Sequence, residues 1–138
     1  MSTPILVMTL YAIWTLILLF GSVGIYRWSR ILTGRADIKQ WRADEQQGNE
    51  WYRRAMRAHM NCVENLPVYS ALAIAAAISN ISTPGLDRLA ITVLVARILQ
   101  SLIHILVEQT NKIATIRFIL FFVQAVCMIA MFVILITN

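Results

Sequence analysis

Four long apolar stretches, separated by polar segments, set the pattern of this chain. Each approaches the length of about 20 residues that a helix needs to cross a bilayer. The short polar segments at 80–87 and 108–114 should make the helices that they join antiparallel neighbours. We therefore predict an all-α, integral membrane four-helix bundle with left-handed up-down topology, formed by residues 1–138 as a single domain. The predicted helices cover residues 4–26, 53–79, 86–107 and 115–136.

Composition supports a membrane protein. Hydrophobic residues make up 59% of the 138 residues, above the roughly 45–50% that is usual in soluble domains. The first apolar stretch is too long for the core of a signal peptide and lacks a basic start and a cleavage site, so we interpret it as a helix. Pro67 is expected to kink the second helix, or to loosen its hydrogen bonds near Val63.

Positive charge is concentrated in one polar connection. Eight of the twelve Lys and Arg residues lie between Arg27 and Arg57, whereas the opposite side of the bundle has only Arg88. The positive-inside rule therefore predicts a multi-pass protein of the inner (cell) membrane, with both termini on the non-cytoplasmic side. Part of this connection, with Trp28 and Trp41, should lie on the membrane surface. The net charge of +5 thus reflects topology, and no nucleic acid partner is expected.

Polar stripes run along three of the predicted helices. Arg57, Asn61 and Glu64 have the spacing i, i+4, i+7, which places them on one face of the second helix. His59 falls on roughly the opposite side. On the fourth helix Arg117 and Gln124 are seven residues apart and share a face. The third helix carries the longest stripe, which consists of Arg97, Gln100, Ser101, His104 and Glu108.

Charged groups at these depths cannot face lipid without a large cost, so they need partners. Glu64 and Arg97 have opposite charge and similar depth, and we expect them to pair, within or across subunits. Each polar residue taken alone can be explained as a contact between helices. Together they exceed what packing needs, and their excess charge is basic. We therefore predict a pocket for a polar, anionic small molecule at the cytoplasmic membrane interface.

The two cysteines do not point to chemistry. Cys62 and Cys127 both lie in predicted helices, match no metal-binding spacing and form no disulfide framework. We interpret both as small buried residues. The sequence therefore predicts no metal site.

The second helix and the residues before it carry a family signature. The chain resembles the MAPEG family, the membrane-associated proteins of eicosanoid and glutathione metabolism. The resemblance extends to the four helices, the long basic first connection and the chain length. It rests on Gly48, Tyr52, Arg54, the run Arg57-Ala58-His59, the pair Asn61-Cys62, Glu64 and Pro67.

The resemblance implies a homotrimer that binds glutathione between subunits near the cytoplasmic face. It implies that glutathione is the co-substrate, and that an apolar electrophile or a lipid reaches it from the bilayer. Arg117 resembles the family's arginine that stabilises the thiolate, and His104 is a second catalytic candidate. The expected glutathione-binding residues are Arg54, Arg57, Asn61, Glu64, Arg97, Gln100 and Ser101.

Some positions depart from the prostaglandin synthase branch of the family. Met60 stands where that branch has a further arginine, and Arg27 is only the nearest candidate for its arginine in the first helix. These departures leave three hypotheses: a glutathione transferase or peroxidase, a non-catalytic lipid- or thiol-binding protein, and a small drug exporter. An exporter would need a membrane carboxylate for proton coupling, and Glu64 is the only deep candidate.

Overall fold

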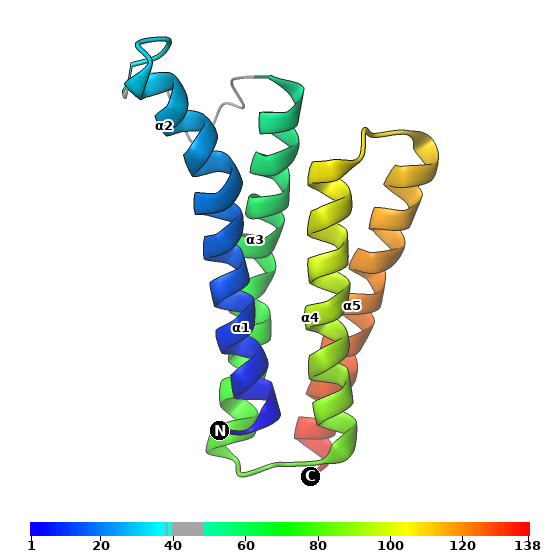
Figure 1. Ribbon diagram of the computed structural model, residues 1–138. Coiled ribbons are helices and arrows are strands. Elements are labelled where there is room, and N and C mark those ends of the chain that lie inside the picture. Colours follow the sequence, from blue (N-terminus) through cyan, green and yellow to red (C-terminus); the bar gives the residue numbers. More distant parts are fainter. Residues whose placement is uncertain (38, 40–48) are drawn as a thin grey trace.

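The structure is a computed structural model that describes residues 1–37, 39 and 49–138. Trp41 and Gly48 lie outside the described residues, so the predicted surface position of Trp41 is not addressed. Within the described part the chain is helical, and its elements are α1 (Thr3–Leu18), the π-helical turn η1 (Leu19–Gly24), α2 (Ile25–Leu32), α3 (Glu50–Ile78), α4 (Pro84–Leu106) and α5 (Asn111–Thr137) (Figure 1).

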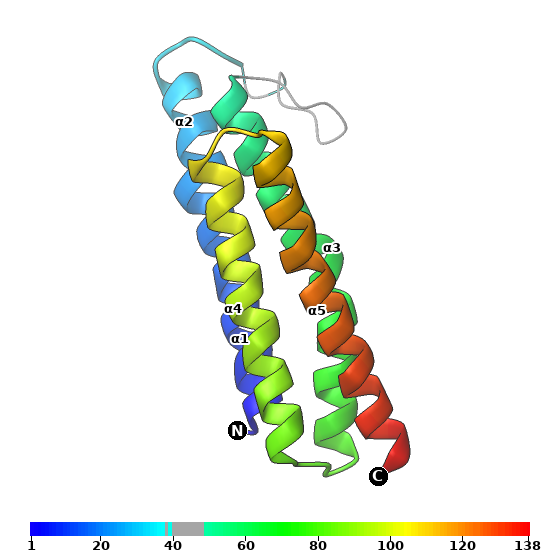
Figure 2. The ribbon, with the colours of Figure 1, turned by 90° about the vertical axis from the view of Figure 1, so that its right-hand side faces the viewer.

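The helices run up and down in chain order. The first membrane span, Thr3–Leu32, consists of α1, η1 and α2, and α3, α4 and α5 supply the other three spans in the described part of the chain. Both termini lie at one end of the bundle, beside the link between α3 and α4, while α2 and the link between α4 and α5 lie at the opposite end (Figures 1 and 2). The predicted four-helix membrane bundle is confirmed.

The first span is longer than predicted, because it continues to Leu32 rather than ending at residue 26. Contacts with the start of α3 hold the added turns in place. The ring of Tyr26 stacks on that of Tyr52 with centroids 4.5 Å apart, and Arg27 Nε donates a hydrogen bond of 2.6 Å to Tyr52 Oη. Aromatic pairs of this kind prefer such short offset stacks. Arg27 and Trp28 therefore extend the helix instead of starting the connection.

Side-chain caps fix the starts of the other three spans. Asn49 Oδ1 accepts a hydrogen bond of 2.8 Å from the backbone N–H of Tyr52, so α3 begins at Glu50, three residues before the predicted start. Thr83 and Thr110 cap α4 and α5 in the same way, and α5 begins four residues before the predicted position. Pro67 lies within α3, which continues through it to Ile78.

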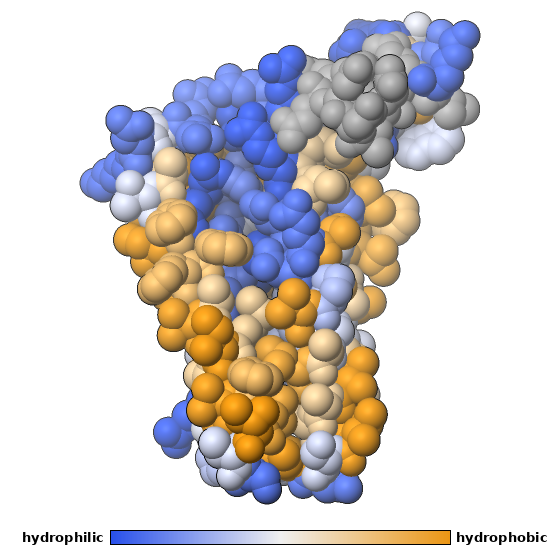
Figure 3. Space-filling model, turned by 180° about the vertical axis from the view of Figure 1, so that it is seen from behind, coloured by the Kyte–Doolittle hydropathy of each residue, from blue (hydrophilic) through white to orange (hydrophobic). Residues whose placement is uncertain are grey.

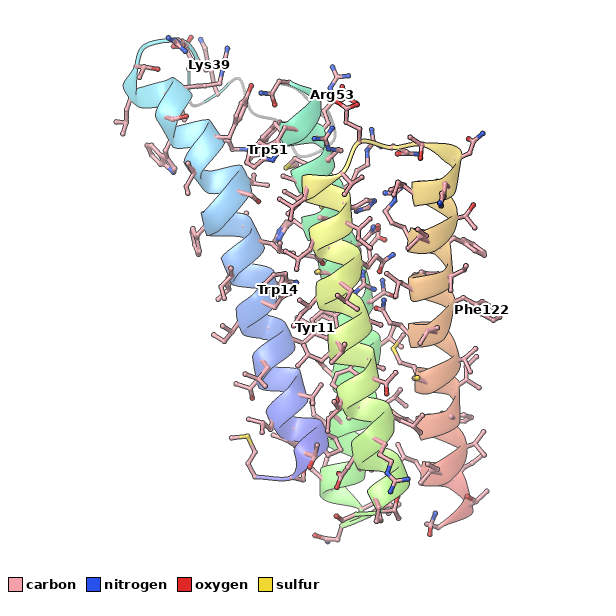
Figure 4. All side chains as sticks on the ribbon, turned by 45° about the vertical axis from the view of Figure 1, so that its right-hand side comes forward. Tyr11, Trp14, Lys39, Trp51, Arg53 and Phe122 are labelled. Carbon is pink, nitrogen blue, oxygen red and sulfur yellow. The ribbon has the colours of Figure 1, made fainter. Side chains whose placement is uncertain are left out.

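The helices do not pack equally against one another. α4 packs most extensively against α5, and α1 packs well against both α3 and α4, whereas α3 and α5 approach each other much less. The outer faces carry large exposed apolar side chains. Phe122 of α5, for example, is 59% exposed and points outward from the bundle (Figure 4). Such faces suit contact with lipid. The loose pairing of α3 with α5 opens the bundle on one side.

Candidate functional site

A polar groove occupies the opening between α3 and α5. It consists of two adjoining cavities of about 410 Å³ and about 440 Å³, which share Asn61, Glu64, His104 and Arg117. Figure 3 shows hydrophilic side chains descending from one end of the bundle into the apolar belt. We call this feature the basic groove; its remaining lining residues are Arg57, Met60, Gln100, Gln109, Ala114, Phe118 and Phe121.

Helix α3 forms one wall of the basic groove. Arg57, Asn61 and Glu64 lie along it, as their spacing predicts. Arg57 Nη1 is 3.4 Å from Gln109 Oε1, so the link between α4 and α5 closes the outer end of the groove. Glu64 is exposed within the chain and lies deeper in the groove than Arg57. This wall therefore presents both a cation and an anion.

Helices α4 and α5 form the opposite wall, which contains polar atoms that are buried and lack a partner. His104 is 6% exposed, and its Nδ1 has no hydrogen-bond partner within the described residues. The same holds for Nε of Arg117, which lines both cavities. Buried polar groups are nearly always paired, so an unpaired one calls for an explanation. A bound polar ligand is one explanation that fits the position of both groups.

The deeper cavity of the groove is partly apolar. Phe118 and Phe121 line it beside Arg117, and their side chains are 66% and 40% exposed. One arginine, one carboxylate and one imidazole thus line the same cavity as these aromatic rings, and Arg57 lines the adjoining one. Each cavity lies within the range of roughly 300–1,000 Å³ that is usual for ligand sites. The groove can bind a small molecule that has both anionic and cationic groups, beside an apolar one.

The structure places Arg97 and Ser101 elsewhere. Arg97 is 1% exposed, and its Cζ lies 5.9 Å from the centroid of the Tyr11 ring, between α4 and α1. Ser101 Oγ donates a hydrogen bond of 2.8 Å to the Arg97 carbonyl and lies 3.5 Å from Cys62 Sγ. We call this group of side chains the inner polar cluster. It consists of Tyr11, Thr15, Cys62, Arg97 and Ser101. It closes inside the bundle and lines neither cavity of the basic groove.

The predicted contact between Glu64 and Arg97 is not made. In the described part of the chain no ion pair joins them, because Glu64 is exposed on the groove side while Arg97 is buried against Tyr11. The same burial keeps Arg97 out of reach of a second chain. The nitrogen atoms Nε and Nη2 of Arg97, and the hydroxyl of Tyr11, have no partner within the described residues.

Two further residues of α3 lie outside the basic groove. Arg54 Nη1 is 3.6 Å from Glu50 Oε1, one turn earlier in the same helix. His59 lines a separate cavity of about 170 Å³ with Leu19 and Val23 of η1, so it is not part of the groove, as its spacing predicts. Of the predicted site residues, the structure brings together Arg57, Asn61, Glu64, Gln100, His104 and Arg117.

Sequence reasoning missed several residues of the site. Gln109 and the rings of Phe118 and Phe121 line the groove, but no polar spacing marks them in the sequence. Gln124 was placed on the same face as Arg117 and not assigned to the site, yet it bonds to Gln100. The described residues contain no cluster of three His, Cys, Asp or Glu side chains that could hold a metal. Both cysteines are free and buried, as predicted.

A larger hollow of about 690 Å³ lies beyond α2 and does not compete as a site. Its lining residues are Ile31, Gly34, Ala36, Asp37 and Lys39. It adjoins residues that the structure does not describe, and the described part contributes only one cation and one carboxylate. The basic groove has more converging polar groups and is therefore the better candidate site.

Comparison with known proteins identifies one family. The sequence model of the MAPEG family matches residues 4–137 of the 138. The match includes all four spans, the basic groove and the inner polar cluster. No curated protein and no solved structure matches the chain at a significant level.

Proposed function

The chain belongs to the MAPEG family, the membrane-associated proteins of eicosanoid and glutathione metabolism, and we propose that it is a membrane-bound glutathione transferase or peroxidase. It would conjugate apolar electrophiles with glutathione, or reduce lipid hydroperoxides with it, at the membrane interface. The observation that carries this proposal is the basic groove, in which arginines, a carboxylate and aromatic rings line adjoining cavities, with two buried nitrogen atoms that have no partner among the described residues.

The charges of the basic groove match those of glutathione, which carries two carboxylates and one ammonium near neutral pH. Arg57 and Arg117 can each bind a carboxylate through two parallel N–H donors. Glu64 can accept from the ammonium, and Asn61 can bond to a peptide group one turn away on α3. Nε of Arg117, which has no partner in the part of the chain that the structure describes, supports such a ligand, because a carboxylate would satisfy it.

Arg117 is the residue that we assign to thiol activation. A free thiol has a pKa of about 8.5, so only a few per cent is thiolate near pH 7. A shift of about two pKa units, which would make the thiolate dominant, needs about 2.7 kcal/mol. A guanidinium close to the sulfur in a partly desolvated groove can supply this. His104, whose Nδ1 has no hydrogen-bond partner within residues 1–37, 39 and 49–138, is a weaker candidate for accepting the thiol proton.

The apolar substrate would enter from the bilayer along α5. Phe118 and Phe121 border the deeper cavity and are exposed on the outer face, so they connect the groove with lipid. In conjugation, the thiolate sulfur bonds to an electrophilic carbon and displaces a leaving group such as chloride. In peroxide reduction, the sulfur takes the distal oxygen, the alcohol leaves, and a second glutathione converts the sulfenic acid to a disulfide and water.

The proposal is tested by calorimetry and by turnover. Detergent-purified protein should bind glutathione and conjugate a chlorinated aromatic electrophile. Arg57→Ala should weaken binding on the order of tenfold, because a charge-assisted hydrogen bond is lost. Arg53→Ala is the matched control, since this arginine lies one turn earlier on α3, is exposed and does not line the groove (Figure 4).

Two outcomes would contradict the proposal in different ways. Absence of glutathione binding by the wild-type protein would point to another ligand. Tight binding without turnover of any electrophile or peroxide would favour the alternative function, a non-catalytic thiol- or lipid-binding protein. An equal effect of Arg53→Ala and Arg57→Ala would show that total positive charge matters and that the groove does not.

We also propose that the chain assembles as a homotrimer, as its family resemblance implies. The outer stripe of α3 supports association, because it combines exposed Glu64 with exposed Ala71 and Ala75. A carboxylate at this depth is costly against lipid, and small residues let helices approach closely. A second copy that covers this stripe would also complete the groove. Native mass spectrometry in detergent should show three chains, and a monomer that binds glutathione would contradict this.

The orientation that we propose places the basic groove at the cytoplasmic face of the cell membrane. Most arginines and lysines of the described residues lie at the end of the bundle that holds α2 and the α4–α5 link, whereas Arg88 lies near the other end. The positive-inside rule then puts both termini outside. Reporter fusions at Asn138 should therefore be active only with a periplasmic type of reporter.

A further inference from the structure

A chain of two amide side chains lies behind the wall of the basic groove. Gln124 of α5 is 1% exposed, and its Nε2 donates hydrogen bonds of 3.0 Å to Gln100 Oε1 and of 3.0 Å to the Leu120 carbonyl. Gln100 of α4 is 5% exposed, and its Nε2 donates a hydrogen bond of 3.1 Å to the Arg117 carbonyl. The chain therefore runs from α5 to α4 and back to α5 at Arg117.

Backbone groups at both ends fix the orientation of these two amides. A carbonyl oxygen only accepts, so the NH₂ group of Gln100 must face Arg117, and that of Gln124 must face Leu120. Side-chain amides are assigned from such networks. The oxygen of Gln100 is then directed toward Gln124, and within the described residues the second N–H of its NH₂ group has no acceptor, so it can donate to a ligand in the groove.

Gln124 is not explained by stability. Its own Oε1 is buried and has no partner within the described residues. A buried amide that is only partly satisfied is worse for stability than an apolar side chain of the same size. Its position does have an effect on the groove, because it holds a residue that lines the deeper cavity next to Arg117.

We propose that Gln124 is a positioning residue that makes Gln100 a hydrogen-bond donor to the anionic group of the ligand and holds it against the turn that carries Arg117. This inference rests on the proposed function, in which the anionic group is a carboxylate of glutathione. Without Gln124 the Gln100 amide keeps only its hydrogen bond to the Arg117 carbonyl, and its oxygen loses the donor that holds it toward α5. A Gln100 oxygen that turns toward the groove repels a carboxylate.

The test is a double-mutant cycle on glutathione binding, measured by calorimetry. Gln124→Met keeps the length of the side chain and removes the amide, and it should raise the Kd about tenfold, as expected when a buried hydrogen-bond partner is lost. Gln100→Met should raise the Kd by a similar factor. In the Gln100→Met background, Gln124→Met should have no further effect. A residue that only packs would give additive losses.

Met131→Leu is the control for packing, since this residue is fully buried, lies seven positions further along α5 and shares the face of Gln124. Its Kd should equal that of wild type, and the melting temperature of Gln124→Met should not fall below that of this control. Wild-type affinity in Gln124→Met, or additive losses in the cycle, would overturn the inference alone. Absence of glutathione binding by wild type would overturn the proposed function together with the ligand assigned here.

Discussion

The basic groove and the inner polar cluster each hold an arginine among polar side chains within the membrane-spanning helices, but the groove is open and the cluster is buried. Arg117 lines an open cavity, and its Nε has no hydrogen-bond partner among the described residues. Arg97 is sealed against Tyr11, where its guanidinium contacts an aromatic face. A desolvated contact of this type contributes about 2 kcal/mol or more. The comparison suggests that one arginine acts on ligands and the other on the bundle.

The polar stripe of α4 supplies both regions. An α-helix turns about 100° per residue, so Gln100 and His104 form one edge of the stripe, and Arg97 and Ser101 form the other. The first edge faces α5, beside the opening between α3 and α5 that holds the groove. The second edge meets Tyr11 of α1 and Cys62 of α3 inside the bundle. The polar stripe of α4 therefore contributes one edge to the basic groove and the other edge to the inner polar cluster.

The largest effect should come from Arg117. In Arg117→Met, kcat for conjugation should fall on the order of 100-fold or more, because a group that stabilises the developing thiolate charge is removed. The melting temperature should stay near that of wild type, since Nε of this side chain has no hydrogen-bond partner among the described residues. Steady-state kinetics with a chlorinated aromatic electrophile measure this. A change confined to KM would assign Arg117 to binding instead.

The next largest effect should come from Glu64, and it should appear in the affinity for glutathione. In Glu64→Gln, the Kd of glutathione should rise about tenfold, because a charged acceptor for the ammonium becomes neutral. Thermal stability should not change, since no ion pair with Arg97 is formed in the described part of the chain. Glu108→Gln, at the exposed end of the same bundle, is the control. Loss of stability with unchanged affinity for glutathione would instead indicate that Glu64 stabilises the bundle, as the predicted pairing with Arg97 implied.

Arg97 should show the reverse pattern. In Arg97→Met, the Kd of glutathione should change less than about threefold, while the free energy of unfolding should fall by about 2 kcal/mol, since the desolvated contact of the guanidinium with the Tyr11 ring is lost. Arg57→Met, measured in parallel, should lose affinity and keep its stability. A tenfold loss of affinity in Arg97→Met at wild-type melting temperature would return Arg97 to the ligand site.

Much of the fold could be predicted, because it follows from the lengths of the apolar stretches and from the positions of the polar segments between them. The spans were correct to within a few residues, except that the first runs on to Leu32. That error arose because Arg27 and Trp28 look like a membrane collar. The stacking of Tyr26 on Tyr52, which extends the helix, joins residues that are far apart in the sequence.

The candidate site could be predicted only in part. Spacing along α3 correctly grouped Arg57, Asn61 and Glu64, because one helix fixes which of its residues share a face. Spacing could not say which edge of the α4 stripe would face the opening, since this depends on how α3, α4 and α5 pack. It also could not find Phe118 and Phe121, because apolar residues carry no signal in an apolar helix.

Two tyrosines in the same part of the bundle give the smallest and most selective comparison. Tyr11 and Tyr69 are both fully buried, and their ring centroids lie 6.1 Å apart. The Tyr69 hydroxyl donates a hydrogen bond of 3.0 Å to the Pro4 carbonyl, whereas the Tyr11 hydroxyl has no partner in the described part of the chain. Tyr69→Phe should therefore lower the free energy of unfolding by about 1 kcal/mol.

Tyr11→Phe should leave stability unchanged or raise it slightly, because it removes an unsatisfied buried group and keeps the ring that faces Arg97. Tyr11→Leu, which also removes the ring, should be less stable than Tyr11→Phe. Chemical denaturation in one detergent measures all three variants. Equal losses in Tyr11→Phe and Tyr69→Phe would mean that the Tyr11 hydroxyl has a partner, such as a buried water shared with Arg97. The inner polar cluster would then be hydrated, and its contrast with the open groove would be one of degree.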